Sequence, residues 1–150
     1  MKNVLLTLVA GIFFLYSCGE KKKADEETVM AEKPVEVAAE PASVFFKHPA
    51  DGATVASPVF IEMGVSGMQI EPAGAVKEGF GHHHILINQM SWPKGEVIPA
   101  SDSTKHYGKG QTDASLELEP GEYTISLQFA DGVHSSYGED MAASIKITVE

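Results

Sequence analysis

From Val44 to the C-terminus, the sequence predicts an all-β fold, an immunoglobulin-like antiparallel β-sandwich of about seven strands. Several runs of strand length alternate apolar and polar residues, which is typical of a strand with one buried face. Clusters of Pro, Gly, Asp and Ser separate these runs, as turns do. No stretch has the sustained 3.6-residue apolar period of an amphipathic helix. Residues 44–150 therefore form one domain, of ordinary size for a sandwich with a single core.

The first clear strands lie in the first half of this domain. Within residues 59–66, every second side chain is apolar: Val59, Ile61, Met63 and Val65. Residues 82–88 differ, because their two faces are both largely apolar, with Ile85 and Ile87 on one face and Leu86 on the other. Such a segment is expected to be a central strand that is covered on both sides.

Two later runs repeat the alternation. Residues 123–130 place four apolar side chains on one face: Tyr123, Ile125, Leu127 and Phe129. Residues 145–149 do the same with Ile145, Ile147 and Val149. A Pro-Gly turn precedes the earlier run, so Tyr123 is a candidate for the corner tyrosine found in immunoglobulin-like folds.

A long connection between residues 90 and 114 interrupts this regular pattern. It is rich in Gly, Pro, Ser and Asp, and it contains Trp92, His106 and Tyr107. Connections of this length without secondary structure are uncommon in compact domains unless they are functional or disordered. The histidine favours a functional loop.

Residues 1–17 are typical of a bacterial lipoprotein signal peptide. The apolar run from Val4 to Tyr16 is too short to span a hydrocarbon core about 30 Å thick. Ser17 and Cys18 follow in the arrangement of a lipobox, in which the cysteine is acylated and becomes the new N-terminus. A plain secretory signal with an incidental cysteine is the alternative. Cys18 is the single cysteine of the chain, which excludes an intrachain disulfide.

Residues 18–43 are expected to form a flexible charged linker behind the lipidated Cys18. Lysines, acids, alanines and two prolines make up much of this segment, and its valines follow no sustained period. Such a composition cannot bury enough apolar surface to offset the entropy lost on ordering. We expect the lipid to anchor the protein to a membrane of the cell envelope, on the periplasmic face or at the outer-membrane surface.

The formal net charge of the chain is −10, and the sequence contains no arginine. Binding to a phosphate backbone requires positively charged side chains, so this composition excludes nucleic acid as a partner. An acidic surface instead raises the local concentration of cations.

Four of the six histidines are candidate metal ligands: His82, His84, His106 and His134. Side chains two residues apart on a strand point to the same side, so His82 and His84 would share one face and His83 would lie on the other. Together with two loop histidines, this pair could bind a zinc or copper ion. Three polar residues could hydrogen-bond to a ligand imidazole: Gln111, Asp113 and Asp131.

Each histidine also has a structural interpretation. A histidine triplet can be solvated or hydrogen-bonded, His106 alone resembles a surface residue, and His134 could bond to the backbone of its turn. His48 is interpreted as structural, and the methionines are expected to pack in the core or at edges. No serine lies in a nucleophile elbow, and Cys18 is taken by the anchor, so the sequence identifies no catalytic residue.

Several segments of the domain form a recognisable set: Pro49 to Val59, Gly67-Met68 with Pro72-Ala73-Gly74, the triplet in Gly81 to Ile87, His106 to Thr112, Pro120-Gly121, and Ala130-Asp131 with His134. The histidine triplet and the Gly-Lys-Gly-Gln-Thr element are the specific members of this set. Together the segments resemble the bacterial family called domain of unknown function 4399. Asp113 stands where the family usually has glutamate, and Tyr123 stands where it often has histidine, which removes one candidate ligand. The family has no established activity, so the resemblance implies the fold and the choice of histidines but no reaction.

Three classes of function are compatible with these features. The first is a membrane-anchored domain that binds zinc or copper through the four histidines. The second is a metal-free adhesion or envelope-scaffold domain, in which the histidines organise the long loop. The third is a metal-dependent redox enzyme, because the histidine spacing is similar in outline to the copper site of copper-zinc superoxide dismutase. The negative charge of the chain disfavours this enzyme, since its substrate is an anion.

Overall fold

The computed structural model describes residues 41–150, which contain nine strands and one short 3-10 helix. The strands are β1 (Ser43–His48), β2 (Ala53–Val55), β3 (Val59–Ser66), β4 (Gln69–Ile70), β5 (Phe80–Ile87), β6 (Thr104–His106), β7 (Asp113–Leu116), β8 (Gly121–Ala130) and β9 (Ala142–Val149). The helix η1 (Glu139–Met141) lies between β8 and β9. Within this part of the chain, no helix is long and apolar enough to cross a membrane. The expectations for the signal peptide, for Cys18 and for most of the linker concern residues outside it.

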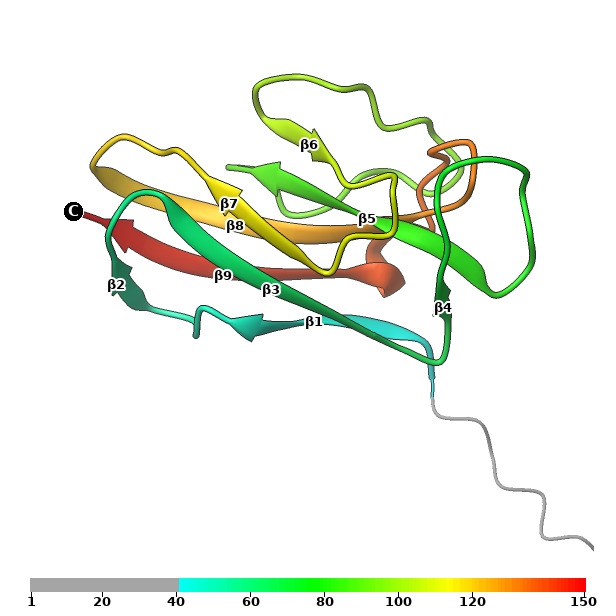
Figure 1. The fold of residues 1–150 in the computed structure, drawn as a ribbon, viewed down its shortest axis with the longest axis horizontal. Coiled ribbons are helices and arrows are strands. Elements are labelled where there is room, and N and C mark those ends of the chain that lie inside the picture. Colours follow the sequence, from blue (N-terminus) through cyan, green and yellow to red (C-terminus); the bar gives the residue numbers. More distant parts are fainter. Residues whose placement is uncertain (1–40) are drawn as a thin grey trace, which may run out of the picture. The chain divides into compact units, whose positions relative to one another are not determined.

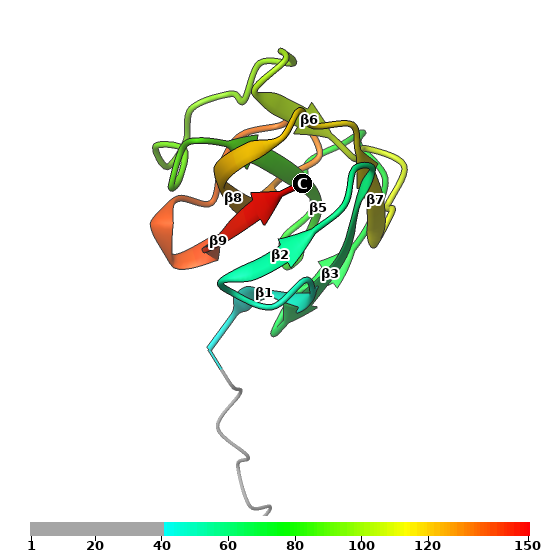
Figure 2. The same ribbon diagram turned by 90° about the vertical axis from the view of Figure 1, so that its left-hand side faces the viewer.

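Two sheets pack against each other as a sandwich (Figure 1; Figure 2). The smaller sheet has the order β1-β3-β7, and its pairings are antiparallel. The larger sheet has the order β2-β9-β8-β5-β4, and β6 also pairs with β5. The predicted all-β sandwich is therefore confirmed. Two pairings depart from the expected antiparallel arrangement, because β2 runs parallel to β9 and β4 runs parallel to β5.

The core between the two sheets contains the apolar faces that the alternation predicted. Its fully buried side chains come mainly from β3, β5 and β8: Val59, Ile61, Met63, Ile85, Ile125, Leu127 and Phe129. The strand β9 adds Ile145, Ile147 and Val149. Burial of these side chains is the main term that stabilises the fold.

The outer face of the larger sheet is covered by the long connection after β5. Leu86 and Ala130 pack there against Ile98, with Trp92 partly buried beside them. The Gln128 side chain links the connection after β5 to the sheet, because its Oε1 accepts a hydrogen bond from the Trp92 backbone N–H at 2.8 Å. Strand β5 is thus covered on both faces and paired along both edges, which confirms the predicted central strand.

The corner before β8 has the hydrogen bond predicted for it. The Tyr123 hydroxyl donates to the carbonyl oxygen of Glu119 at 3.0 Å, as in the tyrosine corner of immunoglobulin-like sandwiches. This bond fixes the entry of β8, the longest strand among the described residues. At its other end, β8 leads into the turn that carries His134.

Candidate metal centre

Strand β5 carries three consecutive histidines whose side chains lie on opposite faces of the larger sheet. All three are buried, with exposed fractions of 0% for His82 and His83 and 1% for His84. His83 lies on the inner face, where its ring centroid is 5.1 Å from that of Phe129. His82 and His84 lie on the outer face, and their ring centroids are 5.0 Å apart. The two-residue period of the strand therefore separates His83 from its neighbours, as predicted.

Two further histidines approach this outer face from either side of β5. His106 is the last residue of β6 and pairs with His84 across the antiparallel ladder. His134 lies in the turn after β8, with its ring centroid 5.2 Å from that of His82 and 4.5 Å from that of His106. Each of the four rings lies within 5.9 Å of the other three. We refer to His82, His84, His106 and His134 as the histidine cluster.

The Nε2 atoms of the histidine cluster face one another in two pairs. Those of His82 and His84 are 3.1 Å apart, and those of His106 and His134 are also 3.1 Å apart. The potential ligand atoms of His82, His84 and His106 all lie within 4.8 Å of one another. A tetrahedral ion about 2.0–2.1 Å from each imidazole nitrogen would hold neighbouring nitrogens about 3.3 Å apart. Three of these histidines could therefore hold a metal ion, and His134 brings a fourth imidazole.

Burial keeps the imidazoles of His82, His84 and His106 uncharged at neutral pH. At His82, burial and then the neighbouring His106 and His134 lower the pKa to about 4, against an opposing effect of the Asp131 carboxylate. At His84, burial and then His82 lower the pKa to about 3. Burial and then His134 also lower the pKa of His106. A neutral imidazole keeps the lone pair that a metal ion requires.

Asp131 shapes the turn that presents His134. The backbone of His134 has a φ of 70°, which is uncommon for a residue other than glycine. Asp131 Oδ1 accepts hydrogen bonds from the backbone N–H groups of Val133 and Ser135, both at 2.9 Å. Its carbonyl oxygen accepts one from the His134 N–H at 3.0 Å. Asp131 thus positions His134 through the backbone, and within residues 41–150 it makes no hydrogen bond to an imidazole.

Two glycines leave space that the cluster needs. A Cβ atom on Gly108 would overlap with Nε2 and Cε1 of His106, so the ring lies where a side chain would otherwise be. A Cβ atom on Gly132 would overlap with the carbonyl oxygen of Ala75, in a loop that packs against the His134 turn. The Gly74 N–H also donates to the Gly132 carbonyl oxygen at 2.8 Å. No residue spacing in the sequence predicts such contacts. The Gly-Lys-Gly-Gln-Thr element, which begins at Gly108, is the one sequence feature that marks this turn.

A family model described as Domain of unknown function (DUF4399) matches residues 61–150. The chain belongs to this family. No curated protein and no solved structure matches the chain. The match confirms the resemblance seen in the sequence, and it includes the whole histidine cluster, Gly108 and Asp131. It begins within β3, so the run from Pro49 to Val59 lies outside it.

In this DUF4399 domain, Gln111 and Asp113 also make no hydrogen bond to an imidazole among the described residues. Gln111 Oε1 accepts a hydrogen bond from the Lys109 backbone N–H at 2.8 Å and so stabilises the turn after Gly108. Asp113 is exposed on β7, in the smaller sheet, where it pairs with Glu62. The buried Nδ1 atom of His82 has no hydrogen-bond partner among residues 41–150.

The remaining two histidines, His83 and His48, lie outside the cluster. Both ring nitrogens of His83 are buried and have no hydrogen-bond partner in the described part of the chain. Burial, and then the neighbouring His82, lower the pKa of His83 to about 4. Exposed His48 lies on β1, with its ring centroid 5.9 Å from that of Phe60. The structural interpretation of His48 stays a prediction.

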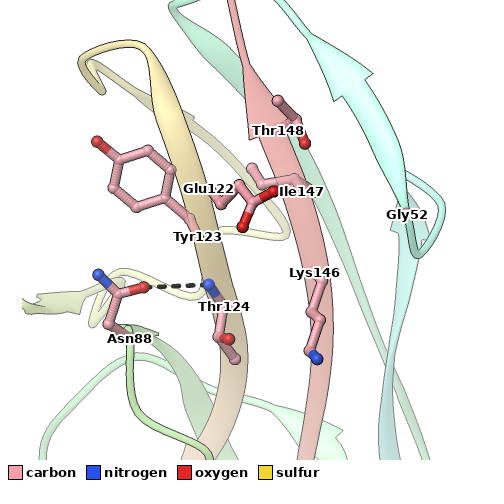
Figure 3. Close-up of a pocket in the computed structure, with 8 residues that line it drawn as sticks. All are labelled: Gly52, Asn88, Glu122, Tyr123, Thr124, Lys146, Ile147 and Thr148. Atoms are coloured by element: carbon pink, nitrogen blue, oxygen red, sulfur yellow. Dashed lines mark hydrogen bonds between the residues drawn. The ribbon is translucent and has the colours of Figure 1, made fainter.

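A hollow of about 370 Å³ also opens on the DUF4399 domain, away from the cluster (Figure 3). Its lining comes mostly from β8 and β9: Gly52, Asn88, Glu122, Tyr123, Thr124, Lys146, Ile147 and Thr148. In Figure 3 the Glu122 and Lys146 side chains extend from neighbouring strands, and Asn88 Oδ1 accepts a hydrogen bond from the Thr124 N–H at 3.1 Å. No histidine lines it, and its charged side chains are exposed, so the cluster remains the better candidate site.

Proposed function

We propose that this domain binds one transition-metal ion, zinc or copper, through the Nε2 atoms of the histidine cluster. The two Nε2 pairs, each 3.1 Å apart among four converging imidazoles, are the observation that carries the proposal. Two of the ligands come from one central strand, which sets their spacing before an ion arrives. Imidazole suits both zinc and copper, and the net charge of −10 attracts cations.

A lipid on Cys18 would hold this metal site in the cell envelope, outside the cytoplasm. The sequence supports this location through the short apolar run that ends at Tyr16 and the cysteine that follows it closely. Between Cys18 and β1, the linker could extend to about 80 Å at most. The site would then sample ions near the membrane to which the chain is attached.

Metal analysis of the full chain tests the proposed site. Protein purified without a histidine tag should contain, or take up on titration with Zn²⁺ and Cu²⁺, about one ion per chain. His84→Ala should abolish this uptake, because it removes a buried ligand. His48→Ala is the matched control, since it removes an exposed histidine outside the cluster and should leave uptake unchanged. A chain that binds neither ion would contradict the proposal.

The same geometry also favours one metal-free alternative. Distances of 3.1 Å between Nε2 atoms fit hydrogen bonds in which one neutral imidazole donates its N–H to the other. The cluster would then fasten β6 and the His134 turn to β5 in an adhesion or scaffold domain. The unfolding temperature separates the two functions. It should rise with zinc concentration if the ion binds the folded state, and it should not change in the metal-free case.

A further inference from the structure

The imidazoles of the histidine cluster differ in their exposure to solvent. His82 and His84 are buried, with exposed fractions of 0% and 1%. His106 is exposed, and His134 is half-buried. An ion among these four rings would therefore have protein on the β5 side and solvent within reach on the side of His106 and His134. We call His106 and His134 the outer pair, because they lie on the solvent side of the buried His82 and His84.

The outer pair also belongs to shorter and less firmly paired segments than the buried pair. His82 and His84 lie within an eight-residue strand that is paired along both edges. His106 ends a three-residue strand, and His134 lies in a turn outside the strands. Segments with few ladder hydrogen bonds open locally at lower free-energy cost than central strands. Either residue of the outer pair can therefore leave an ion while β5 stays in place.

The core between the sheets does not depend on the histidine cluster. The buried apolar residues that form it come from β1, β3, β5, β7, β8, β9 and η1, whereas the side chains of His82 and His84 lie on the outer face of the larger sheet. In small domains with a structural zinc, by contrast, the ion supplies much of the folding free energy. An ion bound here could leave without removing the contacts that hold the sandwich together.

We infer that the site exchanges its ion with partner molecules by ligand substitution at the outer pair. In this step an incoming nitrogen or sulfur ligand bonds to the ion as the bond to His106 or His134 breaks. The departing imidazole keeps its lone pair, and the oxidation state of the ion does not change. The inference rests on the proposed metal site, and it defines the partner as a molecule that presents an imidazole or thiolate. The domain would then pass metal on rather than retain it.

Zinc removal by a chelator tests this inference. The zinc-loaded full chain is mixed in a stopped-flow instrument with 4-(2-pyridylazo)resorcinol, whose zinc complex is coloured, over a range of chelator concentrations. If the chelator attacks the ion from the solvent side, a tenfold higher concentration should give about tenfold faster removal, as for any bimolecular step. A removal rate that is independent of chelator concentration would overturn the inference, because the ion would then dissociate before the chelator binds.

Two variants test whether the chelator attacks the ion at the outer pair. His106→Ala removes an exposed ligand and should speed zinc removal by about tenfold or more at a given chelator concentration, because it opens a coordination position. His48→Ala, which alters an exposed histidine elsewhere, should change the rate by less than about twofold. If His106→Ala releases zinc at the unaltered rate, the outer pair is not the point of exchange and the inference is wrong.

The same experiment distinguishes a failure of the proposed metal site from a failure of the proposed exchange. A full chain that binds no zinc overturns both the metal site and its exchange. A chain that binds zinc but releases it at a rate independent of the chelator keeps the metal site and overturns the exchange alone. If His106→Ala cannot be loaded with zinc, the chelator dependence of the unaltered chain still decides the question.

Discussion

His83 differs sharply in its surroundings from the residues on either side of it. Its ring packs in the core against Phe129, and neither ring nitrogen has a hydrogen-bond partner among the residues that the structure describes. A buried polar group without a partner costs roughly 1–3 kcal/mol of stability. His82 and His84, one residue away on each side, direct their Nε2 atoms to each other. Neighbouring histidines should therefore respond differently to substitution.

Replacing His83 with leucine should raise the free energy of unfolding by about 1 kcal/mol, because it removes the unpartnered nitrogens and keeps most of the side-chain volume. Zinc affinity should not change. Urea denaturation and zinc titration measure the two quantities. The matched variant His82→Leu removes a proposed ligand and should lower zinc affinity by more than about 100-fold. An equal loss of affinity in both variants would contradict the assignment of faces.

The stability of the metal-free protein should fall as the pH falls from about 6.5 to about 4. The pKa of an unfolded histidine is near 6.5, whereas burial lowers the pKa of folded His82 and His83 to about 4. Between these values the unfolded chain binds more protons, so acid favours unfolding by up to about 1.4 kcal/mol per pH unit for each such histidine.

Urea denaturation at pH 7.5 and pH 5, with a chelator present, measures this dependence. His83→Leu should reduce the difference in unfolding free energy between the two pH values, because one titrating group is lost. His48→Ala, in which an exposed histidine is lost, serves as the matched control. Equal stability at both pH values would show that the buried histidines are not the groups that titrate.

Among the secondary-structure elements, long strands could be predicted from the sequence and short ones could not. Strands β3, β8 and β9 have eight to ten residues, which is enough for the two-residue apolar period to appear. Strands β2 and β4 have three and two residues, and their parallel pairing depends on β9 and β5 rather than on their own sequence. The sequence therefore predicts about seven strands, whereas the described residues contain nine.

The features of the candidate site also divide into those that the sequence predicts and those that it does not. The shared face of His82 and His84 follows from their spacing on a strand. The approach of His106 depends on the pairing of β6 with β5 across a long connection, which no local pattern specifies. The contact of Gly108 with the His106 ring and the hydrogen bonds of Asp131 in the His134 turn are local in the sequence. They depend on the backbone conformation of each turn, which the residue pattern alone does not specify.

Gly108→Ala tests how strongly the β6 turn positions His106. The added methyl group would occupy the place of the His106 ring, so the ring should move and zinc affinity should fall by about 10-fold to 100-fold. Gly74→Ala is the matched control, since the nearest atom to its Cβ would be 4.0 Å away. Isothermal titration with zinc compares the two variants. Equal affinities would show that the ring can move without consequence for the site.

At the scale of the whole molecule, the proposed activity depends on where the chain is held. The formal charge of −10 is spread over a chain with 21 acidic and 11 basic residues. A lipid anchor would keep this acidic protein beside a membrane in spite of its negative charge, because acyl chains partition into the bilayer whatever the sign of the protein's net charge. The proposed anchor is therefore the part of the molecule on which the location of the proposed metal site would depend.

Cys18→Ala should release the protein from membranes, because the lipid would have no attachment point. Fractionation of cells that express the variant, followed by immunoblotting, measures the share that sediments with membranes. The unaltered chain is the control and should sediment almost entirely. If the variant sediments to the same extent, the lipoprotein assignment fails, whatever the outcome of the metal experiments.

The parallel pairing of β2 with β9 has a mechanical consequence. β1 and β9 both run toward the end of the sandwich where the C-terminus lies, so β1 starts at the opposite end (Figure 1). Tension between the start of β1 and Glu150 would load the pairing of β1 with β3 and, once that pairing breaks, the pairing of β2 with β9. The strands β2 and β9 are joined in register from Ala53 with Ile147 to Val55 with Val149. These hydrogen bonds are loaded in shear and must break together. Single-molecule pulling from both ends should therefore need a higher force than pulling from Glu122 and Glu150, which would peel β8 from β9 one pair at a time.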